Sequence, residues 1–268
     1  MMWSRCRDLD VAWFEWGRGD PLVLVHGLAD DHRAWRKVLP WLALEHRVIA
    51  YDLRGHGQTS IGQAEGRLVQ LAGDLVALLD ALELDRADLC GFSLGGTIVM
   101  RTAIDHPERV NRLLPVATSS RVGRAAAAWY AERAALAERG PEALRPVLEA
   151  DTREQFETAP QEFDEHWLIR RQSTADPAGF ANACRAMARL NQEPLDPDLG
   201  RIRAQTLVVA AELDRNCPPV AAQIILERLS RGRKELITGS GHQVEVEKPR
   251  ELSEVVLGFL KQPDAAVG

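Results

Sequence analysis

The stretch Gly91-Phe92-Ser93-Leu94-Gly95 carries the strongest structural signal in the sequence. It directly follows a short apolar run, Ala87–Cys90, and directly precedes an apolar helical stretch, Thr97–Ile104. Glycines two residues before and after a serine permit a turn from strand to helix so tight that a side chain there would collide with neighbouring backbone. We therefore predict that Ser93 occupies this turn in a strained conformation, with its hydroxyl projecting above a sheet.

Strand-like runs and helix-like stretches alternate on both sides of this turn. The further strand-like runs are Val11–Trp16, Leu22–Val25, Val48–Tyr51, Leu207–Ala211 and Glu235–Ile237. Leu68–Leu84 instead repeats leucine at three- and four-residue steps, which is the pattern of an amphipathic helix. Strands that alternate with such helices predict an α/β fold with a mostly parallel sheet flanked by helices. The strand-like runs are largely apolar without alternation, so we expect helices on both faces of the sheet.

The alternation stops between about residues 121 and 196. This stretch is rich in Ala, Arg, Glu and Leu with helical periodicity, and it contains no convincing strand. Its prolines predict a division into four or five short helices, and they are Pro141, Pro146, Pro160 and Pro177. We therefore predict an α/β core over residues 1–120 and 197–268, with a helical cap inserted over residues 121–196.

Composition and charge exclude several classes of protein. The chain has 268 residues, 46% of them hydrophobic and 27% charged, as in folded globular proteins rather than disordered or fibrous ones. Its 33 basic and 39 acidic residues give a net charge of −6, which argues against nucleic acid as the main partner. No apolar run approaches the roughly 20 residues of a membrane helix, and Met1–Asp10 lacks the apolar segment of a signal peptide. We expect a cytoplasmic protein that acts on a small molecule, and its oligomeric state stays open.

The four cysteines lie far apart in the sequence and form no Cys-x-x-Cys pair. They are Cys6, Cys90, Cys184 and Cys217, and no histidine stands at metal-ligand spacing from any of them. We interpret them as free thiols rather than as a metal site, which fits a reducing compartment.

A nucleophilic serine needs a base to remove its proton and, in most cases, a carboxylate to orient that base. At this kind of turn the partners follow in the order Ser, acid, His. His242 lies in a loop after the strand-like run Glu235–Ile237, at the same sheet edge as Ser93. Asp214 follows the run Leu207–Ala211 and is our preferred acid, because its rival Glu212 still borders the strand.

Acyl chemistry also needs two backbone N–H groups that stabilise the oxyanion of the tetrahedral intermediate. The residue after the nucleophile, Leu94, supplies one at the start of the predicted helix. We assign the other to Leu28, in the loop after Leu22–Val25, where Gly27 permits a close turn.

Two histidines lie in other loops at this sheet edge. We expect His26 to be a structural hydrogen-bonding residue rather than a second base. In the loop Asp52–Gly57 we expect Asp52 and Arg54 to hold the turn by hydrogen bonds, and we assign no direct catalysis to His56.

These motifs together resemble the α/β-hydrolase superfamily. They are His26-Gly27, the loop Asp52–Gly57, Gly91–Gly95, Asp214 followed by Pro218, and His242 followed by Glu247-Lys248-Pro249. Within the superfamily, Asp176–Phe180 and Glu212-Leu213-Asp214 resemble 3-oxoadipate enol-lactonases, although Ala211 stands where those enzymes often carry Gly.

The resemblance implies a hydrolase of a small carboxylic ester or lactone that uses a Ser-His-Asp triad and no metal or organic cofactor. Haloalkane dehalogenases and epoxide hydrolases are similar but carry Asp at the nucleophile position, so Ser93 favours acyl chemistry. Two alternatives stay open: a carbon–carbon bond hydrolase with the same triad, and a ligand receptor on a hydrolase scaffold without turnover. A perhydrolase side activity is also compatible with the sequence.

The cap is expected to determine selectivity, because substrate would lie between it and Ser93. Trp129 and Trp167 are our substrate-binding candidates, with Tyr130 and Met187 as further residues that could line the pocket. Packing among the cap helices is the alternative for each of them. An arginine of this region, such as Arg170 or Arg185, could clamp a substrate carboxylate.

Overall fold

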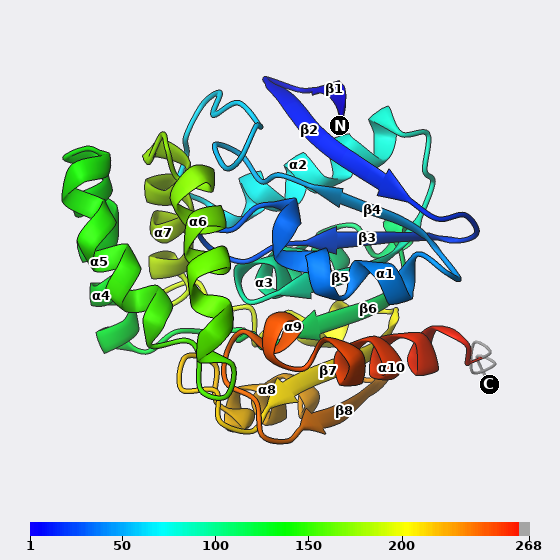
Figure 1. Ribbon diagram of the computed structural model, residues 1–268. Coiled ribbons are helices and arrows are strands. Elements are labelled where there is room, and N and C mark those ends of the chain that lie inside the picture. The colour runs from blue at the N-terminus through cyan, green and yellow to red at the C-terminus, as the bar shows by residue number, and fades with distance from the viewer. Residues whose placement is uncertain (263–268) are drawn as a thin grey trace.

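Residues 1–262 are described by a computed structural model, and their strands form one sheet with helices on both faces (Figure 1). The strands are β1 (Met2–Cys6), β2 (Leu9–Trp16), β3 (Pro21–Val25), β4 (Arg47–Tyr51), β5 (Ala87–Phe92), β6 (Val110–Val116), β7 (Gln205–Ala211) and β8 (Gly232–Ile237). The α-helices are α1 (Leu39–Leu42), α2 (Leu68–Ala81), α3 (Leu94–Asp105), α4 (Arg124–Glu138), α5 (Pro141–Arg153), α6 (Phe163–Ser173), α7 (Ala178–Arg189), α8 (Pro219–Leu226), α9 (Val244–Glu247) and α10 (Pro249–Leu260). Short 3₁₀ helices are η1 (His32–Lys37), η2 (Pro107–Arg109), η3 (Pro160–Glu162) and η4 (Leu199–Arg201).

The eight strands lie in the order β1-β2-β4-β3-β5-β6-β7-β8. β1 and β2 are antiparallel to their neighbours, and every pairing from β4 to β8 is parallel. The predicted fold class, a mostly parallel sheet flanked by helices, is therefore confirmed. Because parallel strands end at the same edge, the loops after β3, β5, β7 and β8 meet at one rim of the sheet.

Each face of the sheet carries its own hydrophobic core. In β3, Val23 and Val25 pack on the face covered by α2 and α3, whereas Leu22 and Leu24 pack on the opposite face with residues of η1, α1 and α10. All four side chains are fully buried. Coverage of both faces explains why the strand-like runs lack polar alternation.

Two strands, β1 and β6, were not recognised in the sequence. β1 is a short edge strand in which three of the five residues are exposed, so it lacks the apolar signal of a buried strand. β6 is central, but its second and third residues, Asn111 and Arg112, are polar, and it contains Pro115, which cannot donate a ladder hydrogen bond. Its pairing with β7 passes from Leu113–Thr206 to Val116–Val209 with no pair at the proline.

The helices α4 to α7 lie together beyond the carboxyl ends of the parallel strands, at the left of Figure 1. They fall within residues 121–196, the range predicted for the cap. Pro141 opens α5 and Pro177 caps α7, as expected, but Pro146 lies inside α5 and does not end it. Any other residue at position 146 would donate its N–H to the carbonyl of Glu142. Glu142 is exposed in the first turn of α5, so water can replace the N–H that Pro146 lacks.

One backbone contact fixes α7 against the loop that follows β4. A Cβ atom on Gly179 would lie 2.1 Å from the carbonyl oxygen of Gly55, and one on Gly55 would lie 2.5 Å from Cα of Gly179. Gly55 also has a left-handed φ of +67°. Both positions therefore require glycine.

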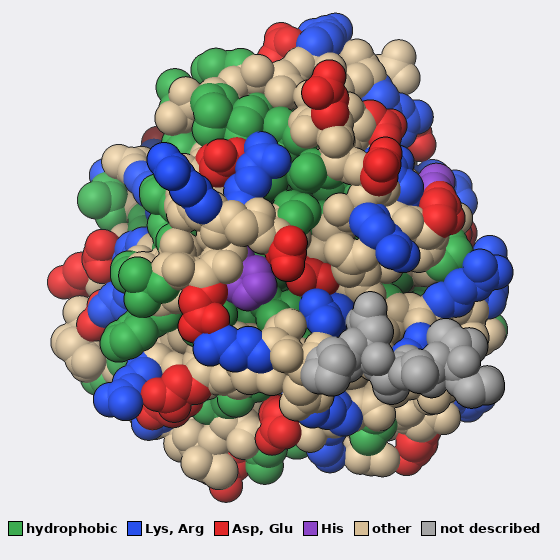
Figure 2. Space-filling model, turned by 90° about the vertical axis from the view of Figure 1, so that its right-hand side faces the viewer, with side chains coloured by type: hydrophobic (Ala, Val, Ile, Leu, Met, Phe, Trp, Pro, Cys, Tyr) green, Lys and Arg blue, Asp and Glu red, His purple; other side chains and the backbone are tan. Residues whose placement is uncertain are grey.

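The face of the molecule away from α4–α7 carries interspersed positive and negative side chains with scattered hydrophobic ones, as Figure 2 shows. Neither sign forms a continuous area on this face. Within residues 1–262, no helix combines the length and the apolar character needed to cross a bilayer.

Candidate active site

Ser93 lies at the junction of β5 and α3 with φ +51° and ψ −117°. Its N–H donates to the Val116 carbonyl (2.9 Å) and its own carbonyl accepts the Thr118 hydroxyl (2.6 Å), so the strained backbone is held on both sides. A Cβ on Gly91 would lie 2.2 Å from the Gly95 carbonyl, and one on Gly95 would lie 2.1 Å from the Val25 carbonyl. The glycines thus permit the tight turn that the sequence predicts.

The structure brings Ser93, His242 and Asp214 into one hydrogen-bonded line. His242 Nε2 lies 3.0 Å from Ser93 Oγ, and His242 Nδ1 lies 2.8 Å from Asp214 Oδ2. His242 is 5% exposed and its ring packs against Phe92 at 5.1 Å between centroids. With Nδ1–H donating to the carboxylate, Nε2 is free to accept the serine proton.

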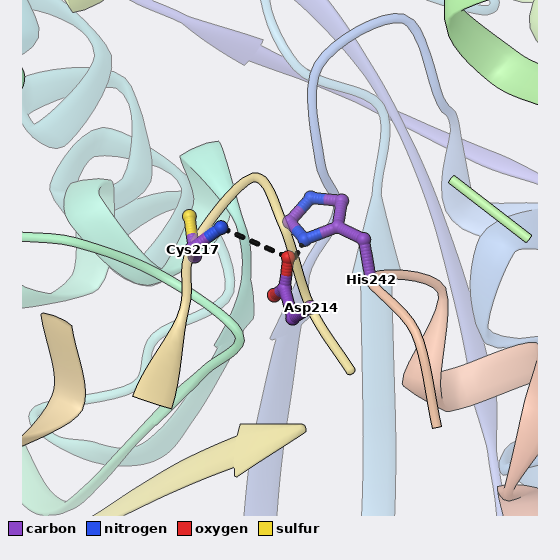
Figure 3. A group of neighbouring side chains, drawn as sticks. All are labelled: Asp214, Cys217 and His242. Carbon is purple, nitrogen blue, oxygen red and sulfur yellow. Dashed lines mark hydrogen bonds and ion pairs between the residues drawn. The ribbon is translucent and has the colours of Figure 1, made fainter. Parts of the chain in front are cut away.

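Asp214 is held in place by its own loop as well as by the imidazole. Its Oδ1 accepts the backbone N–H groups of Asn216 (2.8 Å) and Cys217 (2.9 Å), and Figure 3 shows the carboxylate between Cys217 and His242. Burial alone would raise the pKa of Asp214, but the charge that His242 can carry, its hydrogen bond and these N–H groups hold that pKa below its ordinary value. The rival acid, Glu212, accepts the N–H of Gly239 instead (2.8 Å).

Both residues nominated for the oxyanion hole lie next to Ser93 in the fold. Leu94 is the first residue of α3, so its N–H is one of the donors that a helix leaves unpaired at its N-terminus. Leu28 lines the same cavity as Ser93 and His242. Gly27 is packed so closely on Phe92 that a Cβ there would lie 2.9 Å from the ring.

The cavity shared by Ser93 and His242 has a volume of about 50 Å³. Trp129, Leu148 and Phe180 form an apolar part of its wall. A polar part is formed by Asp30, Gln155, Arg170 and Gln243. A neighbouring cavity of about 240 Å³ shares Trp129, Tyr130, Asp151, Gln155 and Asn216 with it, so the two are adjacent.

Four further candidates from residues 121–196 lie in four different surroundings. Trp167 lines a separate cavity between α5 and α6, which has only Leu148 in common with the cavity at Ser93. Met187 is buried in the hydrophobic core. Arg185 forms an ion pair with Glu138, whereas Arg170 lies in the wall beside Ser93.

The loop residues interpreted as structural are all hydrogen-bonded. His26 Nε2 accepts the N–H of Leu53 (2.9 Å). Asp52 accepts the N–H groups of His32 and Gln58 (both 2.9 Å), and Arg54 binds Asp74 and Asp8. Burial and the nearby His26 lower the pKa of His56 to about 4, so His56 is neutral at pH 7.

Side chains that no sequence pattern indicated connect the loop of His242 to residues 155–158. Glu247 accepts the N–H of Gly241 (2.5 Å) with one oxygen and the N–H groups of Glu157 and Thr158 (both 2.7 Å) with the other. Gln243 donates to Gln155 Oε1 (2.6 Å). The bonds to Gln155, Glu157 and Thr158 join segments about 90 residues apart, and no local pattern indicates such pairs.

Cys217, Asp214 and His242 could in principle offer metal-ligating atoms, because these atoms lie within 4.8 Å of one another (Figure 3). The Asp214 carboxylate is already bound to His242 and to two backbone N–H groups. Burial raises the pKa of the Cys217 thiol, whereas a metal ligand must be a thiolate. The carboxylate of this group is therefore already bound by donors of the protein.

A family model described as the alpha/beta hydrolase fold matches residues 20–249 of the chain. The chain belongs to the α/β-hydrolase family. The α/β-hydrolase described here is 28% identical over 263 residues to 3-oxoadipate enol-lactonase 2 of Acinetobacter baylyi, with 96% of this chain and 95% of that protein covered. It is 29% identical to 2-hydroxymuconate semialdehyde hydrolase of Pseudomonas sp. (strain CF600), with 93% and 90% covered.

Solved structures show the same architecture. The enol-lactonase from Burkholderia xenovorans LB400 superposes with a TM-score of 0.89 at 24% sequence identity, over 97% of this chain and 100% of that one. At this identity the similarity concerns the fold. The family resemblance inferred from the sequence motifs is confirmed by the family match.

Proposed function

We propose that this α/β-hydrolase cleaves a small carboxylic ester or lactone through an acyl-enzyme on Ser93. The observation that carries the proposal is the continuous line from Ser93 Oγ to His242 (3.0 Å) and from His242 to Asp214 (2.8 Å). The named relatives include an enol-lactonase, which supports the substrate class. The small cavity at Ser93 supports a small acyl group.

In the proposed first step, Ser93 Oγ attacks the substrate carbonyl carbon while His242 Nε2 takes the hydroxyl proton. The carbonyl π electrons move to oxygen, and the N–H groups of Leu28 and Leu94 stabilise the resulting oxyanion. Asp214 stays ionised and stabilises the imidazolium. The tetrahedral intermediate then expels the alkoxide, which takes the proton from His242.

In the second step, water attacks the acyl-enzyme and His242 takes its proton. The intermediate expels Ser93 Oγ, which regains the proton from His242, and the carboxylic acid product leaves. None of these steps requires a metal or an organic cofactor.

We also propose that residues 121–196 act as the cap over this site, with Trp129 in contact with bound substrate. Trp167 lines the separate cavity between α5 and α6, so its proposed contribution is to substrates that extend beyond Leu148. The expected partner is a small molecule in the cytoplasm.

The test is Ser93→Ala together with fluorophosphonate labelling and peptide mapping of the wild-type chain. We expect labelling on Ser93, hydrolysis of short aryl esters or lactones, and a loss of at least about 10³-fold in the variant with an unchanged melting temperature. Wild-type rates in the variant would contradict the role of Ser93.

The same measurements separate the two alternatives. Ketonisation before cleavage of a vinylogous diketone, with little activity on simple esters, would replace the ester proposal by carbon–carbon bond hydrolysis. Tight binding of esters without turnover would replace it by a receptor function.

A further inference from the structure

One helix of the cap region holds the turn that carries the Leu28 N–H. His166, Arg170 and Ser173 are spaced four and three residues apart, so they lie on one face of α6. All three contact the turn Gly27–Asp30. His166 Nε2 lies 3.3 Å from Asp30 Oδ1, Arg170 Nη2 donates to the Leu28 carbonyl (3.1 Å), and Ser173 Oγ donates to the Asp30 carbonyl (2.5 Å).

Arg170 is the only one of the three that binds the peptide next to the nominated oxyanion donor. Its side chain is 3% exposed, and its charge is balanced by Asp30, whose Oδ1 lies 3.8 Å from Arg170 Nε. Its Nη1 donates to Gln155 Oε1 (2.5 Å), and Gln155 in turn accepts from Gln243, the residue after His242. Nη1 and Nη2 of Arg170 thus each donate to a protein acceptor, and the side chain links the carbonyl of Leu28 to Gln155.

The turn that Arg170 holds is strained. The N–H of Asp30 donates to the Gly27 carbonyl (3.3 Å), which closes a four-residue β-turn. Its third residue, Ala29, has φ +68° and is fully buried. This φ belongs to a type II turn, where glycine is preferred because a side chain is unfavourable there. Rotation of the Leu28–Ala29 peptide would relieve Ala29 and would turn the Leu28 carbonyl away from Arg170.

We propose that Arg170 is a positioning residue that keeps this turn in its strained form and thereby holds in place the backbone of Leu28, whose N–H, in the preceding peptide, we assign to the oxyanion. The inference rests on the proposed function, because it needs Leu28 as an oxyanion donor. If Arg170 has this role, kcat at Ser93 depends on the packing of α6 against the turn Gly27–Asp30. In this role Arg170 does not contact the reacting atoms.

The first test compares Arg170→Met with Arg171→Met, whose parent residue is the adjacent, exposed arginine of the same helix. We expect Arg170→Met to lower kcat by about 10- to 100-fold, less than the roughly 10²–10³-fold loss of a whole oxyanion donor, with KM within threefold. The inhibition constant of an aryl trifluoromethyl ketone, whose hemiketal oxyanion occupies the same position, should rise by the same factor as kcat falls. Arg171→Met should stay within twofold in all three quantities.

The second test uses Ala29→Gly, because glycine removes the strain that Arg170 is proposed to oppose. We expect Ala29→Gly to raise kcat at least threefold more in the Arg170→Met background than in the wild-type background. If Arg170→Met does not fold, the same measurements are made on Arg170→Lys. This variant keeps a positive charge beside Asp30 but cannot bind Leu28 and Gln155 together.

Three results would overturn the inference: a kcat within twofold of wild type in Arg170→Met, a loss confined to KM with an unchanged inhibition constant, or an equal effect of Ala29→Gly in both backgrounds. Fluorophosphonate labelling of Ser93 in the wild-type chain is measured alongside. If that labelling persists while the coupling is absent, the positioning role fails alone. If the wild-type serine is not labelled, the proposed function itself fails.

Discussion

His242 Nδ1 lies 2.8 Å from Asp214 Oδ2, and the other oxygen of that carboxylate accepts two backbone N–H groups, those of Asn216 and Cys217. The carboxylate therefore cannot rotate without breaking three hydrogen bonds. It fixes the imidazole with Nδ1 protonated, which is the tautomer whose Nε2 can accept the proton of Ser93.

Asp214→Asn tests this relationship. If the amide nitrogen faces His242, it donates to Nδ1 and selects the wrong tautomer, so we expect kcat to fall by about 10³- to 10⁴-fold at nearly unchanged stability. Steady-state kinetics on an aryl ester measure the loss. Glu212→Gln is the matched control, because that carboxylate binds Gly239 and not the imidazole, and it should stay within threefold. More than a tenth of wild-type activity in Asp214→Asn would be incompatible with the proposed role.

Gly95→Ala tests the packing under the turn of Ser93. The new methyl group would lie 2.1 Å from the Val25 carbonyl and 2.7 Å from that of His26, so backbone must move. We expect the free energy of unfolding to drop by about 3 kcal/mol, measured by urea denaturation. Gly258→Ala is the control in α10, where nothing lies within 4 Å, and it should raise stability by about 0.5–1 kcal/mol.

Glu245→Gln tests the effect of a buried carboxyl group on the pH dependence of stability. Burial and the nearby Asp30 raise the pKa of Glu245 well above its ordinary value, against the opposing charges of Arg36 and Arg170. Because the folded pKa exceeds the unfolded one, this contribution to stability is complete below about pH 4.5 and is lost as pH rises toward the folded pKa.

The stability gained by Glu245→Gln relative to wild type should therefore be larger at pH 8 than at pH 5. The slope of that difference is at most about 1.4 kcal/mol per pH unit. Urea unfolding of both proteins at the two pH values measures it, with the exposed Glu235→Gln as the reference. A difference independent of pH would mean that Glu245 is ionised in the folded protein.

Trp129→Ala and Trp167→Ala test which cavity receives the acyl chain. Trp129 lies between the cavity at Ser93 and its larger neighbour, so its removal joins them. We expect the ratio of kcat/KM for hexanoyl over acetyl aryl esters to rise at least fivefold in Trp129→Ala. The rise should be smaller in Trp167→Ala, whose cavity shares only Leu148 with the site. The reverse order would assign the acyl chain to the α5–α6 cavity.

The sequence was most informative where a local pattern is also a physical requirement. The turn Gly91–Gly95 accepts no side chain at its glycines, and buried strands such as β3 are apolar because helices cover both faces. These requirements involve neighbours in the chain, so the fold class followed from them. The edge strand β1 and the proline-containing β6 lack such a pattern and were not recognised.

The wall of the cavity could not be predicted in the same way. Gln155 reaches it from the segment before α6, Arg170 from α6 and Gln243 from the loop of His242. Their roles come from the Arg170–Leu28 and Gln243–Gln155 bonds, each across more than 80 residues. Among many arginines in the chain, nothing local distinguishes Arg170 from Arg171, which faces another cavity.

The backbone contact between Gly55 and Gly179 limits how the cap region can be exchanged. One glycine belongs to the core and the other to α7, and each fills the space that a methyl group on the other would need. A chimaera with helices from a related enzyme must therefore keep glycine at the position of Gly179. Any other residue there would push the new helices away from the loop that contains Gly55. Exchange of specificity on this scaffold is thus restricted by two residues that do not line the cavity at Ser93.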